Sequence, residues 1–206
     1  MPSTMMHLAA GWNIWPEGSD AFFLGCILPD CVDADRALKD HLHFRDIPPS
    51  QRLSRIIDFA KTLSLSRDFD LGILFHFYLD YLWDNGPQAR HRESYTGDCW
   101  FRDYRKELSR AGSRVAQQCD FTPDLWARLR APEKSLYENS LGLPESEIRS
   151  FLENNYLWHT TERLPASEFF TDSLVNEFLR DAAKEFASFC RQEFYRETKV
   201  RPFCIE

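Results

Sequence analysis

One long apolar stretch constrains the fold of this chain more than any other feature. Asp68 to Gly86 reads DFDLGILFHFYLDYLWDNG, in which apolar residues occupy almost every helical position and leave no continuous polar face. A helix of this kind is expected to run through the interior of a protein. The rest of the chain should therefore pack around it.

Two polar side chains, His76 and Asp80, interrupt this stretch at a spacing of four residues. On a helix, residues four apart share a face with their Cβ atoms roughly 6 Å apart, so both side chains can bind one ion. A buried carboxylate must be paired, protonated or bound to a cation, and a neighbouring imidazole favours a cation. The alternative is a hydrogen-bonded His–Asp pair in an ordinary core.

The remaining sequence predicts further helices and no strands. Helical spacing of apolar residues recurs in the segments 5–14, 19–29, 49–63, 100–119, 121–131, 143–161 and 171–197. No stretch shows sustained two-residue alternation, which favours an all-α fold. With 206 residues, 43% of them hydrophobic, the chain is long enough for one well-formed core. We therefore predict a single-domain helical bundle over residues 1–206.

Two helix ends can be predicted from the residues around them. The second segment, from about Ser19, is expected to stay helical until Pro29, because proline interrupts the helical hydrogen-bond ladder. Asp30 then follows a buried helix, either as a carboxylate of a functional site or as a cap for the next segment. Asp68 is expected to cap the central helix.

A charged segment, CVDADRALKDHLHFRDIPPS, follows Asp30's helix and is expected to form a loop or a short helix. It contains His41 and His43, which face different directions in any regular backbone because they are two residues apart. At most one of them should therefore reach a common site. We choose His43, since the apolar Phe44 can anchor it to the core, whereas His41 lies in the most charged part.

Composition argues against several classes of protein. A net charge of −7 and a pI near 5.4 disfavour a general nucleic-acid binder, which needs concentrated Lys and Arg. The six cysteines form no C-x-x-C pair, so we expect reduced thiols and a cytoplasmic protein. The N-terminal segment lacks the basic region of a secretory signal, and no apolar run reaches the ~18 residues of a membrane span.

Four segments, MPSTMMH, FFLGCILPD, KDHLHFRD and HFYLDYLWD, occur in an order that resembles the zinc-dependent phospholipase C family. The order resembles, more distantly, the single-strand-specific nucleases of the same superfamily, and the resemblance covers about the first 85 residues. It implies an all-α bundle in which His7, His43, His76 and Asp80 bind metal, with Asp80 bridging two ions. It also implies that Asp30 is the general base.

The downstream sequence limits the number of metal ions. The larger members of that family use two further histidines and a glutamate for another zinc. Here only His91 and His159 remain, and Tyr95 and Arg163 stand four residues after them. We therefore expect a mono- or binuclear site. Mixed imidazole and carboxylate ligands suit zinc, or iron or manganese, better than Mg²⁺ or Ca²⁺.

These features together predict a metal-dependent hydrolase that activates water and acts on phosphoester bonds of a small phosphorylated compound or a lipid head group. Lys39 either adds positive charge toward the phosphate or pairs with Asp35 or Asp40. Two alternatives stay open. One is a nucleotide phosphohydrolase similar to the HD-type enzymes, although the chain has no adjacent His-Asp pair. The other is a non-catalytic metal-binding or interaction protein, whose metal site would lack an open coordination position.

Overall fold

The computed structural model of the chain describes residues 2–32, 36–131 and 139–194. All the regular elements within these ranges are helices, which confirms the all-α prediction. In chain order they are α1 (Thr4–Ile14), α2 (Asp20–Gly25), the 3-10 helix η1 (Leu28–Cys31), α3 (Arg36–Leu42), α4 (Pro49–Ala60), α5 (Asp68–Asn85), α6 (Pro87–Ser94), α7 (Trp100–Gln118), α8 (Thr122–Arg130), α9 (Glu145–Thr161) and α10 (Asp172–Glu193).

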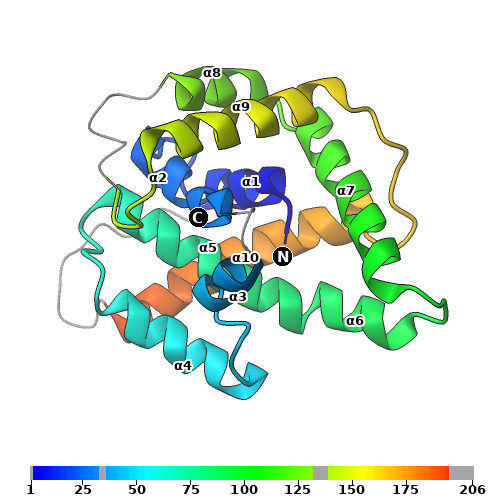
Figure 1. Cartoon of the computed structure of the whole chain (residues 1–206), viewed down its shortest axis with the longest axis horizontal. Coiled ribbons are helices and arrows are strands. Elements are labelled where there is room, and N and C mark those ends of the chain that lie inside the picture. Colours follow the sequence, from blue (N-terminus) through cyan, green and yellow to red (C-terminus); the bar gives the residue numbers. More distant parts are fainter. Residues whose placement is uncertain (1, 33–35, 132–138, 195–206) are drawn as a thin grey trace.

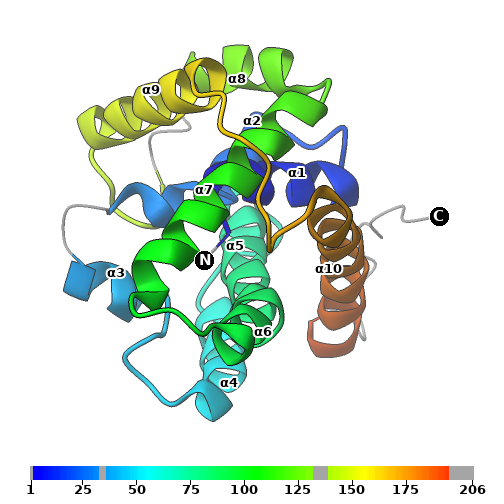
Figure 2. The same cartoon turned by 90° about the vertical axis from the view of Figure 1, so that its right-hand side faces the viewer.

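Helix α5 lies in the middle of the bundle (Figure 1). It contacts α1, α2, α4, α6, α10 and η1, and every residue from 69 to 80 is buried. Figure 2 shows α8 and α9 together at one end of the molecule, with α4 at the other. The interior position predicted for the apolar stretch is therefore confirmed. None of the described helices combines the length and hydrophobicity that a membrane crossing requires.

Helices α2 and α5 cross at two glycines. A Cβ atom on Gly25 would collide with the backbone carbonyl of Phe69, and one on Gly72 would collide with the carbonyl of Phe22. Backbone atoms cannot rotate away as a side chain can, so only glycine allows this crossing. The close approach places the end of α2, and η1 after it, against the part of α5 that carries His76.

Gly72→Ala is expected to lower the free energy of unfolding by about 3 kcal/mol, because the added methyl group must push α2 away from α5. Chemical denaturation measures the change. Gly11→Ala on α1 is the matched control, since its Cβ would meet only side-chain atoms, the nearest being Cys26 Sγ at 3.3 Å. That control should change stability by less than about 1 kcal/mol. Equal effects of the two substitutions would contradict the close crossing.

The predicted end of the second helix was wrong. Helix α2 ends at Gly25, and residues 28–31 form the 3-10 helix η1 instead. Pro29 has no N–H to donate to the carbonyl of Gly25, and its ring would clash with that carbonyl in an α-helix. The chain therefore tightens one turn earlier than predicted, and Asp30 lies within η1.

The predicted cap of the central helix was also wrong. Arg67 occupies the N-cap position of α5, and Asp68 is the first helical residue. The Asp68 carboxylate instead accepts a hydrogen bond of 2.6 Å from Ser19, which also caps α2. This carboxylate therefore ties the starts of two helices together.

The cysteines within the described residues form no disulfide, in agreement with the expectation of thiols; Cys204 lies outside the described residues.

Candidate metal centre

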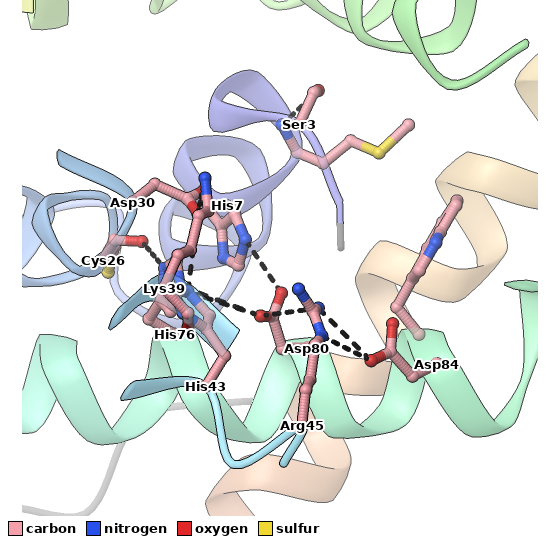
Figure 3. Close-up of polar contacts among 12 residues, drawn as sticks. Ser3, His7, Cys26, Asp30, Lys39, His43, Arg45, His76, Asp80 and Asp84 are labelled. Atoms are coloured by element: carbon pink, nitrogen blue, oxygen red, sulfur yellow. Dashed lines mark hydrogen bonds and ion pairs between the residues drawn. The ribbon is translucent and has the colours of Figure 1, made fainter. Parts of the chain in front are cut away.

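The structure brings five of the predicted site residues into one buried group, which we call the His/Asp cluster (Figure 3). Its members are His7 from α1, Asp30 from η1, His43 from the segment after α3, and His76 and Asp80 from α5. The remaining predicted residue, Lys39 from α3, lies at the edge of the cluster.

His43 is buried in the cluster, whereas His41 lies apart from it. The side chain of His41 is 70% exposed, and its Nδ1 contacts Asp46 at 2.7 Å. Phe44, which follows His43, packs against Phe77 of α5 with ring centroids 5.3 Å apart. Phe44 therefore anchors this part of the chain to the core, as predicted.

The rings of His43 and His76 are held in one orientation by backbone carbonyls. Nδ1 of His43 bonds to the carbonyl of Lys39 at 2.7 Å, and Nδ1 of His76 bonds to the carbonyl of Cys26 at 2.8 Å. A carbonyl oxygen only accepts, so both rings carry a hydrogen on Nδ1. Metal-ligating histidines commonly donate their second ring nitrogen to a carbonyl in this way.

The two Nε2 atoms of these rings lie 3.0 Å apart. Burial, with the nearby His7, lowers the pKa of His76 to about 3, so this ring is neutral and its Nε2 presents a lone pair. If His43 is neutral as well, two lone pairs face each other and repel. The contact is therefore stable only with a cation between the rings, either an additional proton or a metal ion.

Two carboxylates lie close to the Nε2 atoms of His43 and His76. Oδ1 of Asp30 lies 3.4 Å from Nε2 of His43. Oδ2 of Asp80 lies 3.7 Å from Nε2 of His43 and 3.9 Å from Nε2 of His76. Negative charge and nitrogen lone pairs thus converge in the core, an arrangement that a metal cation stabilises.

His7 completes the cluster from the other face of His76. The two rings stack with centroids 4.1 Å apart and an interplanar angle of 11°. Nε2 of His7 lies 3.4 Å from Oδ1 of Asp80, yet neither nitrogen of His7 has a hydrogen bond within the described residues. A buried imidazole without hydrogen bonds is costly, and a metal ion would provide the missing partner.

The donor atoms form two sets that can each hold a metal ion. One set is His7, His76 and Asp80, the other is Asp30, His43 and His76, and the atoms of each set lie within 4.8 Å of one another. Both sets use His76, whose Nε2 has one lone pair and can serve one ion. A second ion would therefore need a bridging carboxylate. Asp80 has the position for this, because its two oxygens face His7 and His43 separately.

Asp30 connects the cluster to Lys39. Nζ of Lys39 lies 3.0 Å from Oδ1 of Asp30, a partner that the sequence did not predict; Asp35 lies outside the described residues. Burial alone would raise the pKa of Asp30, but the contact with His43 and the charge of Lys39 outweigh it. The pKa of Asp30 is therefore well below its usual range, and the side chain is ionised at neutral pH.

Sequence reasoning missed Arg45, which contacts Asp80 at the oxygen that also faces His43, and Asp84, which pairs with Arg45. Nη2 of Arg45 lies 3.4 Å from Asp80 and 3.3 Å from Asp84, and Arg52 reaches Asp84 at 2.9 Å (Figure 3 shows the Arg45 contacts). Burial raises the pKa of Asp80, but His7 and Arg45 overcome this and lower it far below its usual range. The sequence did indicate that Asp84 could belong to the site, because it follows Asp80 by four residues and therefore lies on the same face of the helix.

Comparison of the chain with protein-family models, with curated proteins and with solved structures found no match. The resemblance to the zinc-dependent phospholipase C family therefore stays a prediction from the sequence.

His43→Ala is expected to weaken metal binding at least ~100-fold, because it removes a donor atom from the cluster. His41→Ala should leave metal affinity within about two-fold of the unmodified protein, because that ring lies outside the cluster and is exposed. Equilibrium dialysis against Zn²⁺ measures both affinities. Equal losses, or a larger loss for His41→Ala, would contradict the assignment of His43 as the metal ligand.

Proposed function

We propose that this chain is a metal-dependent phosphoester hydrolase. One observation supports the proposal above the others: two imidazole nitrogens and two carboxylates converge in the core, where a cation is needed to satisfy them. A divalent ion bound there would polarise a phosphoryl oxygen and make water a better nucleophile at neutral pH. The mixed ligands suit one or two zinc ions, with iron or manganese as alternatives.

The protein residues have separate roles in this proposal. His7, His43, His76 and Asp80 would hold the metal, with Asp80 between two ions if both are present. Asp30 is proposed as the base that orients the attacking water and accepts its proton. Because its pKa is below the usual range, Asp30 is ionised at neutral pH and can accept a hydrogen bond from the attacking water. Lys39 holds Asp30 in place and adds positive charge near the phosphate.

A solvent cavity beside the cluster favours an enzyme over a purely structural metal site. Structural zinc sites are closed by four protein ligands, whereas catalytic sites keep one position open. Asp30 and Lys39 both line a cavity of about 220 Å³, so a small molecule in this cavity would lie next to Asp30 at the edge of the cluster. The proposed substrate is a small phosphorylated compound or a lipid head group, and the cysteine pattern supports a cytoplasmic location.

Metal analysis and a hydrolysis screen test the proposal. The purified protein is expected to contain one or two equivalents of transition metal, in line with the ligand sets above. Metal-loaded protein should hydrolyse at least one class among phosphomonoesters, phosphodiesters and nucleotides, and chelation followed by metal addition should remove and restore the activity. Protein that binds no metal would contradict the metal centre. Metal-loaded protein without activity on any of these substrates would favour the non-catalytic alternative.

A further inference from the structure

The cavity beside Asp30 lies where the start of α1 meets α7 and α9, two helices that Figure 1 shows on different sides of α1. Its wall includes Asp30, Lys39, Arg105 and Ser109, with Trp158 and His159 from α9. Of the His/Asp cluster, Asp30 lines the cavity, and apart from Asp30 and Lys39 the wall consists of residues without a role in the site described above.

Arg105 is an unpaired cation in this wall. The arginines elsewhere on α7 are paired: Arg102 with Asp103, Arg110 with Glu107 and Arg114 with Asp172. Arg105 has no ion pair or hydrogen bond within the described residues. Because Lys39 lies in the same wall, two cationic side chains and one carboxylate line the cavity. An anion is the ligand that this balance attracts.

A buried histidine, His159 of α9, also belongs to the lining of this cavity. His159 is 4% exposed, and its Nδ1 has no hydrogen bond within the described residues. Burial lowers the pKa of His159 to about 3, so the ring is neutral and offers one N–H donor and one acceptor.

The cavity is large enough to hold a phosphoryl group. A volume of about 220 Å³ has room for roughly seven groups of the size of water, at ~30 Å³ each. A phosphoryl group and its oxygens fit in that space, and Phe151 and Trp158 contribute aromatic side chains to the lining.

We propose that this cavity binds the dianionic phosphoryl group of a small phosphomonoester, with Arg105 and Lys39 as the recognising cations. The inference rests on the proposed function and names its substrate class. Two cationic side chains and one carboxylate leave a net positive charge in this wall, which attracts the dianion of a monoester more strongly than the monoanion of a diester. The guanidinium of Arg105 can also donate two parallel hydrogen bonds to phosphate oxygens.

Binding of methylphosphonate to the metal-loaded protein tests the role of Arg105, because the C–P bond of this dianion is not hydrolysed. Calorimetric titration at mildly alkaline pH should show that Arg105→Gln weakens binding about 10- to 100-fold. Lys106→Gln is the matched control: it removes the same charge from the next residue of α7, which does not line the cavity. The affinity of this control variant for methylphosphonate should stay within about two-fold of that of the unmodified protein. Equal effects of both variants would overturn the inference.

A second probe tests the substrate class. Dimethyl phosphate, a monoanion, should bind the unmodified protein at least about ten-fold more weakly than methylphosphonate. Equal or tighter binding of dimethyl phosphate would overturn the assignment to monoesters. Vesicles containing phosphatidic acid test whether the phosphomonoester belongs to a lipid or to a soluble compound. Displacement of methylphosphonate by the vesicles would identify the ligand as a lipid, and no displacement would identify it as a soluble monoester.

These binding experiments are independent of turnover. A protein that binds methylphosphonate through Arg105 but hydrolyses no phosphoester would overturn the proposed function and support the binding site. A protein that hydrolyses phosphoesters and binds methylphosphonate equally well after Arg105→Gln would overturn the binding site and support the proposed function.

Discussion

Replacing His76 with alanine is expected to abolish metal binding and to lower the free energy of unfolding by about 3–5 kcal/mol. His76 is fully buried and belongs to both candidate ligand sets. The substitution removes the shared Nε2 donor, and it also breaks the 2.8 Å bond from Nδ1 to the carbonyl of Cys26 that joins α5 to the end of α2. Asp80 then keeps its charge in the core with one stabilising neighbour fewer.

Equilibrium dialysis against Zn²⁺ and chemical denaturation measure the two effects of His76→Ala. His41→Ala is the control for loss of a histidine as such, and it should change stability by no more than about 0.5 kcal/mol, because that side chain is exposed. Metal content that survives His76→Ala would remove this residue from the ligand set. The buried contact between His76 and Asp80 would then be an ordinary core pair.

Asp30→Asn is expected to lower turnover by about two to four orders of magnitude while the fold and most of the metal are kept. The amide has the size of the carboxylate but lacks its charge, so it can neither orient the attacking water as strongly nor accept its proton. The pairing with Lys39 at 3.0 Å is weakened as well. The measurement compares kcat and bound metal in the variant and the unmodified protein on the best substrate of the screen.

The metal content of the Asp30→Asn variant distinguishes two roles of Asp30, metal ligand and base. The residue belongs to one of the two candidate ligand sets, with His43 and His76. If Asp30→Asn loses metal to the same extent as His76→Ala, Asp30 is a ligand and not the base. If metal is kept and turnover is unchanged, Asp30 has neither role and the cluster does not act through it.

The sequence alone determined the parts of this structure that depend on local spacing. The dense apolar run of α5 predicted an interior helix, because a helix without a polar face can only be buried. The spacing of His76 and Asp80 predicted a shared face, since helical geometry relates residues four apart. The choice of His43 over His41 also came from local chemistry, through the apolar anchor Phe44.

Helix ends and remote contacts needed the tertiary structure. The early end of α2 and the contact between Ser19 and Asp68 depend on how α2 approaches α5 across Gly25 and Gly72. No periodicity in the chain encodes that approach, because it arises from the packing of two helices far apart in sequence. The resemblance could suggest that His7 and Asp30 belong with α5, but not their distances or orientations.

Only the tertiary structure decided the polar environment of the site. The carbonyl partners of His43 and His76, which turn both Nε2 atoms toward each other, are backbone atoms with no sequence signature. Arg45 reaches Asp80, and Arg105 reaches the cavity, because the packing of their helices and segments brings them there. Charge and spacing along a chain predict which residue types can bind a metal or a phosphate; the three-dimensional packing decides which of them meet.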